Sequence, residues 1–206
     1  MTLKNLIYME SLKIKSMTQK PLSDIEKYDY IVSICRNIFE KKMKDYGTSW
    51  RHLRPSSLTD QIFIKAKRLK TLDIIKEQKI SDKPEDEWIG IINYCIIALI
   101  QLELINDERI DLYADEIMNL YDQKVQVVKN LMLKKNHDYG DAWKDMRISS
   151  LIDLVLVKLH RIKQIEDNQG KTLISEGVEA NYMDIINYSI FALIKIKFPE
   201  GYKSSF

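Results

Sequence analysis

The sequence contains little glycine, proline or cysteine. Six glycines and four prolines occur in 206 residues, well below the roughly 12% that these two residues reach in an average chain. β-Sandwiches, propellers and glycine-rich cofactor domains need many turn residues and are therefore disfavoured. Cys35 and Cys95 lie in apolar segments, and neither belongs to a CxxC motif or a Cys–His cluster. This indicates two buried thiols and no structural zinc site.

The chain also lacks an excess of one charge and a long hydrophobic run. Lys and Arg number 32 against 30 Asp and Glu, so the net charge is +2. This balance disfavours sequence-independent coating of nucleic acid but is compatible with a local basic pocket. No apolar run reaches the roughly 18 residues of a membrane span, and no signal peptide is recognisable. We therefore expect a cytoplasmic protein without a membrane partner, and an apolar share of 45% is enough for a core.

The expected organisation is one compact domain built from two repeats. Residues 20–106 form the first repeat and residues 107–198 the second. Residues 1–19 are expected to be a disordered N-terminal extension, with Met17 as a second candidate start of translation, and residues 199–206 a C-terminal tail.

The two repeats are copies of one unit. Residues 42–68 match residues 135–161 at a constant offset of 93, and twelve of these 27 positions are identical, whereas average composition would give about one or two. At an offset of 94, IINYCIIALI (91–100) matches IINYSIFALI (185–194). Between the copies the apolar residues vary while Asp, Arg, Ser and Lys are kept. The kept polar residues therefore indicate a role beyond packing, although a recent duplication would also leave identities.

Helical periodicity predicts three helices in each repeat. A capping box at Ser23 and Glu26 opens the first helix. A DYG tripeptide ends it in both repeats, where Gly47 and Gly140 supply a left-handed cap. Paired serines are then expected to cap the second helix of each repeat.

The second and third helices complete the predicted fold. They are expected over about 58–75 and 85–104 in the first repeat, and over about 151–166 and 178–197 in the second. The third helices are apolar nearly all round and should be the most buried. The prediction is an all-α, six-helix bundle of two tandem three-helix repeats related by a pseudo-two-fold axis.

One face of the second helix carries repeated charges that suit an anion. At 100° per residue, Ser57, Asp60, Lys65 and Arg68 fall on one side of the helix. Two cations beside a helix N-terminus favour phosphate, and an arginine in the preceding loop extends the set. The alternative is a solvated face with internal ion pairs. The expected ligand- or phosphate-binding residues are Arg54, Ser57, Lys65, Arg68, Arg147, Ser150, Lys158 and Arg161.

Further repeated polar and aromatic residues lie on the third helix and in the loop after the first. The adjacent Asn and Tyr of the third helix form either a structural network or the lining of a ligand pocket. The loop aromatics either stack on a nucleobase or form a hydrophobic clasp. The residues expected to shape a pocket are Tyr46, Trp50, Asn93, Tyr94, Tyr139, Trp143, Asn187 and Tyr188. The three histidines have no counterparts between the repeats, which disfavours a shared catalytic base.

These motifs resemble the nucleotide modification-associated domain 1 family. K-x-x-D-Y-G-x-x-W, R-x-S-S, D-x4-K-x2-R and I-I-N-Y-x-I-x-A-L-I each occur twice, and the resemblance covers about residues 20–198. It implies a link to nucleotide or DNA-base modification. A looser resemblance, to all-α nucleotide pyrophosphohydrolases of the MazG kind, implies magnesium held by carboxylate pairs. This chain departs from that pattern, and the residues that could hold one Mg²⁺ are Asp60, Asp153, Glu179 and Asp184.

Two functional hypotheses follow. The first is a protein that binds a nucleotide or another phosphorylated small molecule; if it is an enzyme, it hydrolyses a phosphoanhydride with Mg²⁺. The second is a non-enzymatic adaptor or structural bundle whose surface binds protein or nucleic acid, and a homo-oligomer is compatible with either. The second predicts Asp60, Arg68, Asp153 and Arg161 mutually paired, with no open pocket between the repeats.

Overall fold

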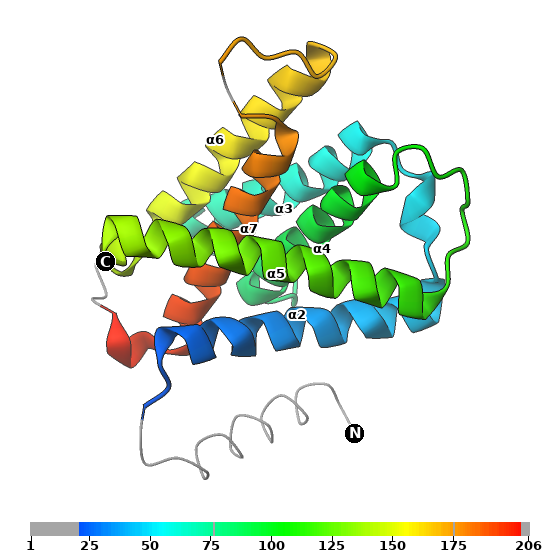
Figure 1. The fold of residues 1–206 in the computed structure, drawn as a ribbon. Coiled ribbons are helices and arrows are strands. Elements are labelled where there is room, and N and C mark those ends of the chain that lie inside the picture. The colour runs from blue at the N-terminus through cyan, green and yellow to red at the C-terminus, as the bar shows by residue number, and fades with distance from the viewer. Residues whose placement is uncertain (1–20, 76, 175, 203–206) are drawn as a thin grey trace.

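The computed structural model describes residues 21–202, with the exception of residues 76 and 175. In this part of the chain it contains six α-helices, three short 3-10 helices and no β-strand (Figure 1). The first repeat contributes α2 (Asp24–Tyr46), η1 (Ser49–His52), α3 (Pro55–Ile75) and α4 (Pro84–Glu103), and the second contributes α5 (Ala114–Tyr139), η2 (Ala142–Asp145), α6 (Ile148–Asp167) and α7 (Val178–Lys197). The last 3-10 helix, η3 (Pro199–Gly201), lies in the C-terminal tail. The predicted all-α class is confirmed. The predicted extension over residues 1–19 lies outside the described residues.

The six helices form a bundle in which the two repeats exchange contacts. Helices α3, α4, α7 and α6 pack in a ring, each against the next. Helices α2 and α5 lie side by side and run across this ring (Figure 1), where each contacts both α4 and α7. Each first helix thus packs against the third helix of its own repeat and against that of the other repeat. This exchange is what a pseudo-two-fold axis between the repeats requires.

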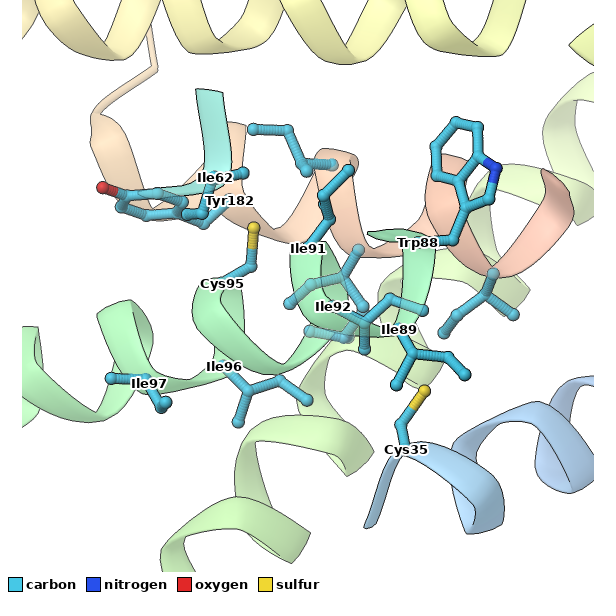
Figure 2. Close-up of a cluster of buried hydrophobic side chains, with 14 of the residues drawn as sticks. Cys35, Ile62, Trp88, Ile89, Ile91, Ile92, Cys95, Ile96, Ile97 and Tyr182 are labelled. Atoms are coloured by element: carbon cyan, nitrogen blue, oxygen red, sulfur yellow. The ribbon is translucent and has the colours of Figure 1, made fainter. Parts of the chain in front are cut away.

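The third helices form the centre of the core, as their composition predicts. Nearly every residue of α4 from Glu87 onward, and of α7 from Asn181 onward, is buried. Figure 2 shows Cys95 of α4 pointing toward Ile62 and Tyr182, among buried isoleucines. Cys35 and Cys95 are both fully buried, and burial raises the pKa of the Cys35 thiol to about 12. Both thiols are therefore packing residues.

The start of α2 agrees with the sequence prediction. The backbone N–H of Ser23 donates to the Glu26 carboxylate at 2.7 Å, and the backbone N–H of Glu26 donates to the Ser23 hydroxyl at 3.3 Å. Gly140 has the predicted left-handed conformation after α5. Gly47 has φ 57° but ψ −142°, so it keeps the positive φ that favours glycine without forming the left-handed helical cap.

The prediction that the paired serines are N-caps is wrong. Helix α3 begins at Pro55 and α6 begins at Ile148, so both serine pairs lie inside the first turn. The ring of Pro55 fixes φ near the helical value, which favours proline at the first helical position. The residue before α6 is Arg147, and its side chain makes no cap hydrogen bond. None of the helices in the described ranges is long and apolar enough to cross a membrane.

Two crossed hydrogen-bond networks tie the repeats together. The Tyr121 hydroxyl of α5 donates to Asn93 Oδ1 of α4 at 2.9 Å, and Asn93 Nδ2 donates to the carbonyl of Cys35 in α2 at 3.1 Å. The second copy matches it position for position. The Tyr28 hydroxyl donates to Asn187 Oδ1 at 2.9 Å, and Asn187 Nδ2 donates to the carbonyl of Val128 at 3.4 Å. Each asparagine thus bonds to the first helices of both repeats.

Removal of one tyrosine hydroxyl tests these networks. We expect Tyr121→Phe to lower the free energy of unfolding by about 1–3 kcal/mol, because the buried Asn93 oxygen loses its donor. Tyr28→Phe should cost a similar amount through Asn187. Urea denaturation measures both, and Tyr113→Phe, at a residue 81% exposed, is the matched control. Equal stabilities of Tyr121→Phe and Tyr113→Phe would show that the crossed hydrogen bond contributes nothing.

Candidate functional site

The repeated cations of α3 converge on one carboxylate of α4. Lys65 Nζ lies 3.1 Å from Glu87 Oε2, and the Arg68 guanidinium pairs with Glu87 Oε1. Arg68 also donates to the carbonyl of Asp82 at 2.8 Å. The Glu87 side chain is only 11% exposed. We call Lys65, Arg68 and Glu87 the repeat 1 cluster; its cations are satisfied within the protein.

Gly90 makes room for this arrangement. A Cβ atom at Gly90 would lie 2.9 Å from Cδ and Cε of Lys65, closer than non-bonded carbon atoms approach. The lysine chain therefore crosses the helix at the glycine and reaches Glu87 one turn away. The equivalent residue in the second repeat is Asp184.

The same positions of the second repeat are paired differently. Asp184, 6% exposed, lies between two lysines: Lys158 of α6 at 2.7 Å, and Lys135 of α5. Asn181 stands where the first repeat has Glu87, and its amide donates to the carbonyl of Gly177 at 2.9 Å. Arg161, the counterpart of Arg68, is exposed and makes no ion pair within the described ranges. We call Lys135, Lys158, Arg161 and Asp184 the repeat 2 cluster.

Two tyrosines lie beside the repeat 2 cluster. Burial raises the pKa of the Tyr188 phenol; Asp184 and Tyr139 add to the rise, and Lys135 and Arg161 oppose it. Tyr188 therefore lies within electrostatic range of Asp184, Lys135, Arg161 and Tyr139. Tyr139, at the end of α5, is 72% exposed, so an aromatic ring accessible to solvent lies within electrostatic range of Tyr188. Glu176, in the loop before α7, adds an exposed carboxylate within range of Lys135.

The aspartates of α3 and α6 pair across the pseudo-two-fold axis. Lys163 Nζ lies 2.6 Å from Asp60 Oδ1, and Lys70 Nζ lies 2.7 Å from Asp153 Oδ1. Lys70 and Lys163 are equivalent residues, so the two ion pairs are copies of each other. Both aspartate side chains are more than half exposed, and such pairs contribute below about 1 kcal/mol each.

The four predicted metal ligands are not brought together. Asp60 and Asp153 pair with lysines between α3 and α6, Asp184 lies between two lysines, and Glu179 is exposed in the first turn of α7. No group of three or more His, Cys, Asp or Glu side chains in the described ranges is placed to hold a metal ion. The donor set for magnesium inferred from the resemblance therefore gains no support from the geometry.

The loop aromatics divide between core and surface. Trp50 and Trp143 are buried, and the Trp143 ring stacks on Phe191 with centroids 4.4 Å apart. This geometry matches the hydrophobic clasp rather than a platform for a base. Tyr46 and Tyr139 are instead 69% and 72% exposed. The indole nitrogens of both tryptophans are buried and have no hydrogen-bond partner in the part of the chain that the structure describes.

The other predicted site residues lie around these clusters. Arg54 and Arg147 are exposed just before α3 and α6, and Ser57 and Ser150 are half-buried in the first turns. Asn93 and Asn187 belong to the crossed networks, so they act structurally, with partners other than the neighbouring Tyr94 and Tyr188. Those two tyrosines are half-buried at the edge of the core.

The two clusters do not share one cleft. The repeat 1 cluster joins α3 to α4, and the repeat 2 cluster joins α5 and α6 to α7. The ring of helices places these interfaces on opposite sides. The cavity on the pseudo-two-fold axis is lined by tyrosine and aliphatic side chains, such as Tyr28, Ile92, Tyr121 and Ile186, and not by the lysines or arginines of either cluster. The second hypothesis predicted that Asp60, Arg68, Asp153 and Arg161 pair with one another, and the structure pairs them differently. The aspartates pair with Lys163 and Lys70, and Arg68 pairs with Glu87. Arg161 pairs with neither aspartate in the described ranges.

A third polar network was missed by the comparison of the repeats. The Thr59 hydroxyl donates to the Glu166 carboxylate at 2.7 Å and lies 2.7 Å from the Tyr182 hydroxyl. The counterparts of Thr59 and Tyr182 are Ile152 and Trp88, so identity between repeats gives no signal here. Lys135 was missed as a site residue for a different reason. Lys135 is one of the identical pairs, but its partner Asp184 lies on another helix.

The Glu166 carboxylate supplies a test by pH. Burial raises its pKa above the ordinary value of 4.5, so the folded state binds this proton more tightly than the unfolded state does. Stability is therefore lost as pH rises from about 4.5 through the raised pKa, and the loss is complete above it. We expect Glu166→Gln, which can still accept from Thr59, to be more stable at neutral pH by less than about 1 kcal/mol.

Urea denaturation between pH 4 and pH 8 measures this difference. The advantage of Glu166→Gln should grow across the window and then stay constant. Glu108→Gln, which removes an exposed carboxylate from the loop between α4 and α5, is the control. A constant difference at every pH would contradict the raised pKa.

The comparisons with known proteins agree with the duplicated geometry. A family model, nucleotide modification associated domain 1, matches residues 42–102 and again residues 135–196. The two matches contain α3 with α4 and α6 with α7, and therefore both clusters. No curated protein and no solved structure matches the chain, and the looser resemblance to the MazG kind stays a prediction. Because the two matches together cover more than half of the sequence, the chain belongs to the nucleotide modification associated domain 1 family, in two tandem copies.

Proposed function

We propose that the protein binds the phosphate group of a nucleotide, or of another phosphorylated small molecule, at the repeat 2 cluster. The observation that carries this proposal is the state of Arg161, an exposed guanidinium without an ion pair in the described ranges. It lies in the same cluster as Lys135 and Lys158, which share the single carboxylate of Asp184. A guanidinium fork beside two ammonium groups matches the geometry and charge of a phosphate dianion.

The surroundings of the cluster favour a nucleotide among phosphorylated ligands. Tyr139 exposes most of its ring within electrostatic range of Tyr188, which in turn lies near Arg161. An exposed aromatic ring close to a phosphate site can stack on a base, and such stacking contributes about 1–3 kcal/mol. The family description, which refers to nucleotide modification, points to the same ligand class.

Magnesium enters this proposal only together with the ligand. Two of the carboxylates near the cluster are engaged, since Asp184 holds two lysines and Asp153 pairs with Lys70, whereas Glu176 is exposed within range of Lys135. Mg²⁺ is often bound through substrate phosphates with one or two carboxylates. Hydrolysis of a phosphoanhydride would then need a group other than a set of carboxylates to activate the attacking water. Binding is therefore the primary proposal and hydrolysis the secondary one.

A second candidate is a non-enzymatic helical adaptor. The observation that favours it is that four of the repeated polar residues serve the fold itself. Asn93 and Asn187 form the crossed networks, and Asp60 and Asp153 form reciprocal ion pairs. This candidate predicts that no phosphorylated small molecule binds at Arg161.

Ligand-induced stabilisation separates the two candidates. We expect one or more nucleoside mono-, di- or triphosphates to raise the melting temperature of the wild-type protein, because a ligand that binds only the folded state stabilises it. Arg161→Ala and Lys135→Ala should each lose most of this shift. Differential scanning fluorimetry, with and without Mg²⁺, and with inorganic phosphate and pyrophosphate alongside the nucleotides, measures the effect.

Lys134→Ala is the matched control, since it removes the same charge from an exposed residue next to Lys135. It should keep the full shift. If the Tyr139 ring stacks on the base, Tyr139→Ala should reduce the shift produced by nucleotides more than the shift produced by pyrophosphate. No shift with any ligand, or equal shifts in Arg161→Ala and the wild type, would overturn the proposal and favour the adaptor.

A further inference from the structure

The two clusters contain the same lysine–arginine pair but bind it differently. Lys65 and Lys158 are equivalent, as are Arg68 and Arg161. In the first repeat both cations bind Glu87, whereas in the second the lysine binds Asp184 and the arginine has no carboxylate partner among the described residues. The difference follows from two positions one turn apart, where Glu87 and Gly90 are replaced by Asn181 and Asp184.

We infer that the carboxylate of Glu87 occupies the anion site of repeat 1 from within, so that each chain binds one phosphorylated ligand, in repeat 2. This inference rests on the proposed function. It adds the number of ligands bound per chain and names Glu87 as the residue that sets this number. A carboxylate offers one oxygen to each of two cations, as a phosphate does. Glu87 does this with Oε2 toward Lys65 and Oε1 toward Arg68.

Burial makes the internal anion hard to displace. The Glu87 and Arg68 side chains are 11% and 19% exposed, and a phosphate that took the place of Glu87 would leave a buried carboxylate without its partners. Loss of the partners of a buried charge is strongly unfavourable. Gly90 supports the closed state, because it lets the Lys65 chain lie across α4 toward Glu87.

The second repeat lacks this internal anion. Asn181 is buried, and its amide is bonded to the backbone of Gly177, so it offers no charge to Arg161. Asp184 at the glycine position draws Lys158 and Lys135 to itself. The arginine is left exposed to solvent, where a ligand can reach it. Whether the arginine is paired within the protein or left for a ligand therefore depends on one equivalent position, residue 87 in repeat 1 and residue 181 in repeat 2.

Exchange of these residues tests the inference. Isothermal titration calorimetry of the full chain with inorganic pyrophosphate and, in parallel, ATP should give one site per chain for the wild type. Asn181→Glu places a carboxylate opposite Arg161 and should weaken binding at least about tenfold, because like charges are brought together. Asn181→Gln, which adds the same length without charge, should keep the wild-type affinity within a few fold.

The reverse exchange should open the first repeat. Glu87→Asn leaves Lys65 and Arg68 without their carboxylate, and we expect two sites per chain. Circular dichroism and thermal unfolding verify the fold of each variant. If Glu87→Asn does not fold, the wild-type stoichiometry and the pair Asn181→Glu and Asn181→Gln still decide the matter.

The outcomes separate this inference from the proposed function. Absence of binding in the wild type would overturn both. Two wild-type sites per chain, or unchanged affinity in Asn181→Glu, would overturn the inference and leave phosphate binding in place. A folded Glu87→Asn that still has one site would show that Glu87 does not occupy an anion site.

Discussion

The crossed asparagine–tyrosine hydrogen bonds hold the two repeats in one structure. Asn93 and Asn187 each lie in the most buried helix of their repeat and each bond to a tyrosine of the other repeat. A buried amide is costly when it lacks partners and adds stability when it is satisfied. Separation of the repeats would leave both amides and both hydroxyls without partners. The duplicated unit is therefore complete only when the second copy is present.

This constraint determines where the charged residues of the third helices lie. With α4 and α7 fixed at the centre, positions before the asparagines reach the edges facing α3 and α6. Glu87 is six residues before Asn93, and Asp184 is three residues before Asn187. The carboxylates are thus displaced by one turn relative to the same fixed point. The displacement decides which cations each of them binds.

The sequence predicted the helices well and their partners poorly. Periodicity and the offset of 93 located the six α-helices of the described residues, and the composition of α4 and α7 identified the core, because these properties are local. The partners Lys163 for Asp60 and Tyr121 for Asn93 lie 103 and 28 residues away, and nothing local encodes them. The serine caps failed for another reason. In α3, Pro55 suits the first helical position, so the helix begins before the serines; α6 begins at the equivalent Ile148 without a proline.

Identity between the repeats marks shared structure more reliably than it marks a site. The identical asparagines and aspartates make the same contacts twice, within the core and across α3 and α6. The identical arginines do not, because Arg68 pairs with Glu87, whereas the residue equivalent to Glu87 in the second repeat is the uncharged Asn181. A duplicated protein can keep one copy of a site closed as part of its fold while the other copy stays open. In this chain the chemical difference between the clusters lies at two positions that the repeats do not share, 87 with 181 and 90 with 184.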